Sequence, residues 1–338
     1  VLDFKSLYPS IIRTFNIDPL GLVLAADPAL PDDASVPGFR GVRFAREGHI
    51  LPDLIEQLWA QRDAAKQASD APLSQAIKII MNAFYGVLGS PGCRFFDPRL
   101  AASITLRGHE ILQRTKERIE AAGHTVIYGD TDSVFVWIEE ATGDAAAEAA
   151  GRQLEATLNA WWRETLAAEY AVESRLELEF ETHYRRFLMP TVRGSEKGSK
   201  KRYAGIVLKP DGSTELVIKG LEAARTDWTP LARAFQRELF RRVFAGEPYA
   251  AWIRQLTDRL FAGELDDQLV YRKRLRRELA DYAADRAPPH VAAARQLDRP
   301  VRSVEYVITT RGPQPVEKRA APLDYEHYLT RQLAPAAD

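Results

Sequence analysis

Two short apolar runs on either side of a polar turn form the clearest local pattern in the sequence. Residues 125–127 and 134–138 are rich in β-branched and aromatic side chains, and Tyr-Gly-Asp-Thr-Asp-Ser lies between them. Such runs, separated by turn residues, predict a β-hairpin. Because side chains alternate along a strand, Asp130 and Asp132 are expected to point to the same side of this hairpin.

Another apolar run opens the sequence and leads into a third acid. Residues 1–12 read VLDFKSLYPSII, so Asp3 follows two apolar residues and the chain then turns towards Pro9. We expect a strand that ends near Asp3 and a helix that begins close to Ser10, with Pro9 at or near its first turn.

Apolar residues at helical spacing predict a helical hairpin after residue 48. Leu54, Leu58 and Trp59 form a stripe over residues 51–68, a Ser-Asp-Ala-Pro turn follows, and a return helix spans residues 74–85. Polar residues also recur at helical spacing within each arm. They are Arg62 and Lys66 on the first arm, and Lys78, Asn82 and Tyr85 on the second.

Weaker patterns organise the rest of the chain. The Pro/Asp-rich residues 27–38 predict a surface loop, and the alternation over residues 176–181, which places Glu179 and Glu181 among apolar residues, predicts a half-buried strand. From Thr229 and Pro230 onwards, two amphipathic helices are expected, the second ending before Gly263.

Composition sets limits on the class of protein. The 338 residues are 46% hydrophobic and 28% charged, which suits a globular protein of several domains. The formal net charge of −1 argues against a general basic surface, so contacts with nucleic acid would need local patches. The single cysteine, Cys93, excludes an intramolecular disulfide and a Cys-rich zinc site. Without an apolar run of membrane-spanning length or a secretory leader, we expect a cytoplasmic protein and no membrane partner.

Three motifs in sequence order resemble those of family B DNA polymerases. They are D-x-x-S-L-Y-P-S-I-I from Asp3, K-x-x-x-N-x-x-Y-G from Lys78, and Y-G-D-T-D-S from Tyr128. Residues 74–107, 200–205, 219–222 and 322–328 are similar to bacterial members of the family, so the resemblance covers nearly the whole chain.

The resemblance implies an α+β fold with a palm, helical-hairpin fingers and a mostly helical thumb. The palm would comprise residues 1–48 and 93–228, the fingers residues 49–92, and an incomplete thumb residues 229–338. Complete members carry an N-terminal domain and an exonuclease domain before the first motif, so we expect this sequence to be a fragment.

By the same resemblance, the site would transfer dNMP from a dNTP to a primer 3′-hydroxyl with release of pyrophosphate. Two Mg²⁺ ions, for which Mn²⁺ can substitute, would bind Asp3, Asp130, Asp132 and the Phe4 carbonyl. Whether Glu179 and Glu181 assist this site or simply face solvent is open. Lys78 is the expected catalytic cation at the leaving group.

The nucleotide-binding residues implied by the resemblance come from the first two motifs and the fingers. Tyr8 corresponds to the ring that excludes a ribose 2′-hydroxyl, and Tyr85 would lie under the nascent base pair. The full set is Ser6, Leu7, Tyr8, Arg62, Lys66, Lys78, Asn82 and Tyr85.

Expected DNA contacts form two basic groups. Lys200, Lys201, Arg202, Tyr203 and Lys219 match the family's pattern for a segment that follows the primer–template duplex, where contacts sense shape more than sequence. Arg272, Lys273 and Arg274 are a second patch, which a solvated helix face explains equally well.

The resemblance also implies partners and a cellular role. The partners are primer–template DNA and dNTPs, with a sliding clamp contacted through parts outside this sequence, and the role is DNA repair or damage-associated replication. Two rival functions are a DNA-binding module that has lost catalysis and a two-metal nuclease. The intact acidic and cationic residues count against the first, and the nucleotide-binding hairpin counts against the second.

Overall fold

Four short strands from distant parts of the sequence pair into one antiparallel sheet. The computed structural model describes residues 1–139, 143–190, 201–283 and 287–337. Its first sheet has the order β4-β5-β1-β6 and is formed by β1 (Leu2–Phe4), β4 (Thr125–Asp130), β5 (Ser133–Trp137) and β6 (Leu178–Phe180). The sheet belongs to Val1–His183, one of two compact units; the other is Tyr184–Asp338.

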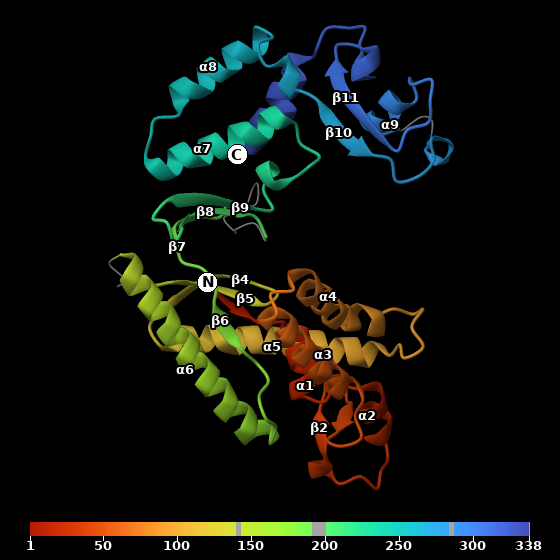
Figure 1. Cartoon of the computed structure of the whole chain (residues 1–338), viewed down its shortest axis with the longest axis vertical. Helices are drawn as coiled ribbons and strands as arrows, with labels where there is room; N and C mark the ends of the chain where they lie inside the picture. Colours follow the sequence, from red (N-terminus) through yellow and green to blue (C-terminus); the bar gives the residue numbers. More distant parts are fainter. Residues whose placement is uncertain (140–142, 191–200, 284–286, 338) are drawn as a thin grey trace. The chain divides into compact units, whose positions relative to one another are not determined.

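Two long helices pack against this sheet in the first unit (Figure 1). They are α5 (Pro98–Ala121) and α6 (Asp144–Tyr170). Helix α5 begins at Asp97, whose side chain accepts a hydrogen bond from the amide of Arg99, with proline at the first helical position. The core between helices and sheet contains Phe4, Val134 and Trp162, all nearly inaccessible to solvent.

The predicted helical hairpin is present and longer than expected. It consists of α3 (Leu51–Gln67) and α4 (Ala71–Leu88), which pack against each other. The side chain of Asp70 caps α4 by accepting a hydrogen bond from the amide of Leu73. The return helix therefore begins three residues before the expected Ser74 and continues past Tyr85.

Two sequence expectations near the N-terminus need correction. Helix α1 (Leu7–Thr14) begins before Ser10, because Ser6 adopts a left-handed backbone conformation and reverses the chain directly after β1; Pro9 is in the first turn as expected. Part of the predicted loop is a strand, β2 (Ser35–Pro37), which pairs with β3 (Arg43–Ala45). Buried Val36 and Phe44 explain this pairing. Helix α2 (Pro19–Leu24) precedes them.

The second unit begins with a three-stranded antiparallel sheet of β7 (Tyr184–Leu188), β8 (Tyr203–Leu208) and β9 (Thr214–Lys219). A glycine is required where β9 ends. Gly220 has φ +64°, and a Cβ at this position would lie 1.9 Å from the carbonyl oxygen of Lys201. The chain just before β8 and the chain just after β9 therefore lie very close to each other.

The expected pair of amphipathic helices follows this sheet. They are α7 (Pro230–Ala245), capped by Thr229, and α8 (Ala250–Phe261). The unit ends with α9 (Pro289–Ala294), α10 (Tyr325–Tyr328), a π-helical turn (Leu329–Leu333) and α11 (Ala334–Ala337).

A second sheet in this unit was not predicted from the sequence. Strands β10 (Tyr271–Arg274), β11 (Ser303–Thr309) and β12 (Gly312–Pro315) pair in that order. The basic run from Arg272 therefore lies on an edge strand, so the helix-face interpretation was wrong. The mixed helices and antiparallel sheets confirm the α+β class, while the division into palm, fingers and thumb stays a prediction. No helix in the described ranges is long and apolar enough to cross a membrane.

Candidate active site

The strand pairing of the first unit brings Asp3 beside the acidic hairpin. Asp3 on β1 is directly opposite Ser133 on β5, and the Ser133 hydroxyl donates a 2.7 Å hydrogen bond to Oδ1 of Asp3. The amide of Phe4 donates to the carbonyl oxygen of Asp132 at 2.8 Å. Two acids that are 129 positions apart in the sequence are therefore fixed on adjacent strands.

The hairpin carries its acids in a tight turn, as the sequence predicts. Thr131 adopts a left-handed φ of 50°, and its hydroxyl donates to Oδ1 of Asp130 at 3.0 Å. Asp130 and Asp132 flank this residue, and the charge of Asp130 acts on Asp132.

The electrostatics of the site favour a cation. Burial raises the pKa of Asp3 to about 6, with further increases from the charges of Asp132 and Glu181, against the hydrogen bond from Ser133 and the charge of Lys78. The pKa of Asp132 is also raised, first by burial and then by the charge of Asp130. Each carboxylate is thus held where its negative charge is unfavourable, and a bound positive charge would relieve this.

The donor set fits a divalent ion held by few protein ligands. Within the described ranges, no three Asp, Glu, His or Cys side chains converge to form a metal cage. Mg²⁺ is commonly held by only one or two carboxylates together with substrate phosphates. Asp3 and Asp132 are a pair of this kind, and the metal-binding roles of Asp3, Asp130, Asp132 and the Phe4 carbonyl all stay predictions.

The second arm of the helical hairpin places one cation near the acids. Lys78 is exposed on α4, and its charge lowers the pKa of both Asp3 and Asp132. Asn82, one turn further along, donates its side-chain amide to the carbonyl oxygen of Lys78 at 3.0 Å. The structure therefore brings Lys78 towards the acidic pair, while Asn82 bonds to its own helix.

The first arm places another cation at the start of α1. Nη1 of Arg62 lies 3.4 Å from the Ser6 hydroxyl, and its Nε is buried with no hydrogen-bond partner among the described residues. Ser6 does not cap α1 with its side chain, and the first amides of a helix have no partner within it. A guanidinium beside such a helix start suits an anion. Leu7 is buried, so contact with a nucleotide would use its backbone. Lys66 instead pairs with Asp63 at 3.8 Å.

The two tyrosines singled out from the sequence pack together. The rings of Tyr8 and Tyr85 have centroids 4.8 Å apart and are tilted by 54°. Burial raises the pKa of Tyr8, and the neighbouring Tyr85 and Asp132 raise it further, so its hydroxyl stays protonated at neutral pH. Tyr8 thus packs against α4 through Tyr85 and is exposed to the charge of Asp132.

The acids on and beside β6 separate into two roles. Lys5 forms ion pairs with Glu177 at 3.2 Å and with Glu179 at 3.1 Å, so Glu179 is a partner of Lys5. Glu181 donates its amide to the carbonyl oxygen of Val1, and its charge raises the pKa of both Asp3 and Asp132. The negative charge of Glu181 therefore acts on the acidic site.

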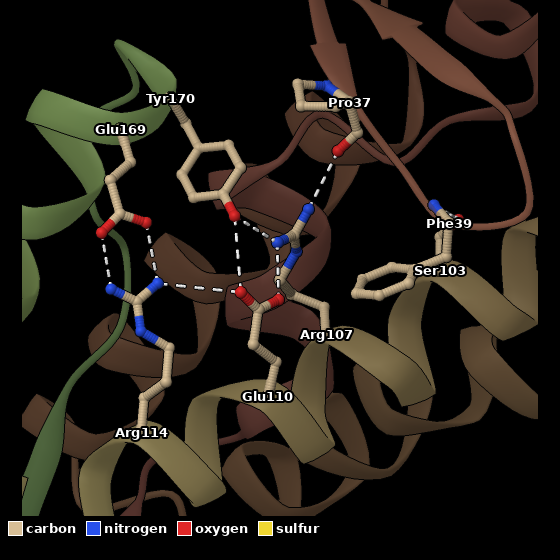
Figure 2. Close-up of polar contacts among 8 residues, drawn as sticks. All are labelled: Pro37, Phe39, Ser103, Arg107, Glu110, Arg114, Glu169 and Tyr170. Atoms are coloured by element: carbon tan, nitrogen blue, oxygen red, sulfur yellow. Dashed lines mark hydrogen bonds and ion pairs between the residues drawn. The ribbon is translucent and has the colours of Figure 1, made fainter. Parts of the chain in front are cut away.

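A buried cation that the sequence did not indicate, Arg107, joins α5 to neighbouring segments of the first unit (Figure 2). The guanidinium of Arg107 donates to Glu110 Oε2, the Tyr170 hydroxyl and the Pro37 carbonyl at 2.7, 2.8 and 2.9 Å. It also lies 4.3 Å from the centroid of the Phe15 ring. Arg107 therefore ties α5 to the C-terminal ends of α1, α6 and β2. These contacts could not be predicted, because a single arginine within a helical segment forms no pattern in the sequence.

The family comparison agrees with these motifs and this geometry. The model of DNA polymerase family B matches residues 1–338. The chain belongs to DNA polymerase family B.

Several family B members are similar to this chain over its whole length. DNA polymerase II of Escherichia coli (strain K12) is 56% identical over 351 aligned positions, which include all of this chain and 44% of the relative. A DNA polymerase of Thermococcus gorgonarius is 28% identical, again over 100% of this chain and 44% of the relative. The chain therefore spans less than half the length of these relatives.

A solved family B structure confirms the fold. The family B DNA polymerase from Pyrobaculum calidifontis superimposes with a TM-score of 0.64 and 27% sequence identity, covering 99% of this chain and 44% of that one.

In the second unit, part of the expected family B DNA-contact segment can be located. Tyr203 on β8 is directly opposite Lys219 on β9, so these two residues are adjacent. Arg202 forms an ion pair with the buried Glu222. Lys201 is exposed two residues before β8, and its backbone carbonyl lies close to Gly220, whereas Lys200 lies outside the described residues.

The other basic patch is on the edge strand β10. Arg272 and Lys273 have weak ion pairs, to Glu305 at 3.7 Å and to Asp227 at 4.0 Å, and Arg274 is exposed. Alternation along the strand places Arg272 and Arg274 on one side and Lys273 on the other. Their role as DNA contacts stays a prediction.

Proposed function

We propose that this chain carries the polymerising site of a DNA-directed DNA polymerase. The reaction is template-directed transfer of dNMP from a dNTP to a primer 3′-hydroxyl, and its partners are primer–template DNA and the four dNTPs. The observation that carries the proposal is the convergence of the Asp3–Asp132 pair with Lys78 and with the Tyr8–Tyr85 rings. The similarity to DNA polymerase II supports a role in DNA repair or damage-associated replication.

Each group has a physical role in this reaction. The primer 3′-hydroxyl loses its proton to solvent, its oxygen bonds to the α-phosphorus, the bond from that phosphorus to the bridging oxygen breaks, and pyrophosphate leaves. Arg62 and the first amides of α1 suit the triphosphate, because both present positive charge to an anion. Lys78 stabilises the leaving pyrophosphate and supplies its proton. The ring of Tyr8 would exclude a ribose 2′-hydroxyl.

The acidic pair supplies the metal-binding part of the site. Asp3 and Asp132 would hold Mg²⁺, or Mn²⁺ in its place, with Asp130 and the Phe4 carbonyl contributing. When bound, two such ions neutralise charge on the entering and leaving oxygens. Ser133 orients Asp3 for this task through its hydrogen bond.

The arrangement favours a polymerase over a two-metal nuclease. A nuclease needs the acids but has no use for a helical hairpin that directs Lys78 and Arg62 to the same site. The packed pair of tyrosines beside the acids likewise suits a site that selects a nucleotide.

Primer extension by the purified chain tests the proposal. With a primed template and Mg²⁺, we expect extension only by the dNTP that is complementary to the next template base, and no addition to an unprimed strand. A folded chain that extends no primer with any dNTP, in Mg²⁺ or Mn²⁺, would contradict the proposal. Progressive shortening of the primer would instead identify a nuclease.

Substitution of Tyr8 by alanine should relax sugar selection. We expect the preference for dNTP over rNTP, measured as a ratio of kcat/KM values in single-turnover extension, to fall by about tenfold or more. Truncating the ring opens space for a 2′-hydroxyl, whereas Tyr8→Phe retains the ring and should preserve the preference. An unchanged ratio in Tyr8→Ala would show that Tyr8 is only a packing residue.

A further inference from the structure

The ring of Tyr8 lies next to a glycine of helix α5, Gly108. Gly108 is buried within α5, and the residues that face it come from α1: Leu7, Tyr8 and Ile11. On another side, the ring of Tyr8 packs against Tyr85. The environment of Tyr8 thus combines an aromatic neighbour with a bare stretch of helix backbone.

There is room for one methyl group between Gly108 and this ring. A Cβ built on Gly108 would lie 3.4 Å from Cε1 of Tyr8, 3.6 Å from Cδ1 of Ile11 and 3.7 Å from Cδ2 of Leu7. These are ordinary contact distances between carbon atoms. Alanine would therefore fit here without displacing a neighbour.

Neither backbone geometry nor sterics accounts for glycine at this position. Gly108 lies inside an α-helix, away from the left-handed conformations that favour glycine. In a helix interior, glycine is less stable than alanine because it loses more conformational freedom on folding. On that side the Tyr8 ring faces the backbone of α5 across a space that would hold one methyl group. The chain thus forgoes stability beside a residue of the proposed nucleotide site.

We propose that Gly108 is a positioning residue that leaves space for the ring of Tyr8 to move. The degree to which the site excludes ribonucleotides then depends on the absence of a side chain at Gly108. The inference rests on the proposed role of Tyr8 in sugar selection. A ribose 2′-hydroxyl that presses on the ring can displace it towards Gly108, because the ring and this glycine are separated by a space that would hold one methyl group. Tyr85 restricts movement in its own direction. Gly108 therefore lets some ribonucleotide enter, which a methyl group would prevent.

The substitution Gly108→Ala tests this directly. We expect kcat/KM for dNTP to stay within about twofold of wild type while kcat/KM for rNTP falls on the order of tenfold, the lower end of the effect of one methyl group in a packed pocket. The variant should also melt at a higher temperature than wild type. An unchanged dNTP/rNTP ratio would overturn the proposal.

Two further variants separate this role from general packing. Ile111 lies about one turn further along α5 and is buried in the core of the first unit. The variant Ile111→Val should leave the dNTP/rNTP ratio unchanged. If Gly108 acts through the ring, Gly108→Ala should have no effect on the ratio in a Tyr8→Ala background. An equal effect in both backgrounds would overturn the proposal.

The single variants also test the role of Tyr8 and the role of Gly108 separately. If Tyr8→Ala leaves sugar selection unchanged, the proposed role of Tyr8 fails. If Tyr8→Ala relaxes selection and Gly108→Ala does not tighten it, the role of Tyr8 stands and only the inference about Gly108 fails.

Discussion

Asp3→Asn and Asp132→Asn are each expected to reduce primer extension on the order of a thousandfold or more. Each substitution removes one negative charge from the pair that would hold the metal ions, and asparagine oxygen is a weaker ligand for Mg²⁺. Single-turnover extension at saturating Mg²⁺ and dNTP measures the effect. Extension near the wild-type rate by either variant would contradict the assignment of the acidic pair.

The same substitutions should leave the fold intact. The folded-state pKa of Asp3 is raised to about 6 from an ordinary 3.8, so the stability of the metal-free protein falls as pH rises through this interval. Asp3→Asn removes that dependence and can still accept the hydrogen bond from Ser133, so its melting temperature at neutral pH should equal or exceed that of wild type. Glu177→Gln, which alters an acid paired with Lys5 beside the same sheet, is the matched control and should keep full activity.

Arg107→Ala is expected to destabilise the first unit by about 3 kcal/mol or more. The Arg107 side chain is only 6% exposed, and its loss leaves the Pro37 carbonyl and the Tyr170 hydroxyl without this donor. Glu110 keeps a partner in Arg114, at 3.7 Å, which limits the cost. Urea unfolding followed by tryptophan fluorescence measures the change, because Trp162 is buried beside α5.

An exposed arginine supplies the control for this prediction. Arg152 on α6 is 64% exposed and pairs with Glu148 one turn away, so Arg152→Ala should change stability by less than about 1 kcal/mol. Arg107→Lys should recover only part of the loss, because an ammonium group lacks the planar fork that reaches several acceptors. Equal unfolding midpoints for wild type and Arg107→Ala would show that the network contributes no net stability.

The elements that carry the candidate site could be predicted because their signals are local. Alternation around Asp130 and Asp132 identified the β-hairpin, and helical spacing of Lys78, Asn82 and Tyr85 identified helix α4. The family resemblance then indicated that Asp3 belongs with the hairpin. The strand register that places Asp3 opposite Ser133 could not be read from the sequence, because it depends on pairing between distant segments.

The failures have the same physical origin. Ser35–Pro37 is a strand only because Arg43–Ala45 pairs with it, and the basic run from Arg272 is extended only because β11 pairs with it. Gly108 and Arg107 gave no signal, since their significance comes from Tyr8, Pro37 and Tyr170, which lie far away in the sequence. Local propensity is weak compared with such tertiary contacts.

The central position of β1 has a consequence for the order of folding. This strand is the first in the chain, yet its two neighbours in the sheet are β5 and β6, so it pairs only with segments more than a hundred residues away. Closing such long loops costs entropy before any contact compensates for it, and a high mean sequence separation of contacts slows folding. The helical hairpin of α3 and α4 involves only neighbouring residues and can form early. During synthesis, β1 would remain without its partner β6 until residue 180 is available, so Leu2 and Phe4 could not complete their burial before then.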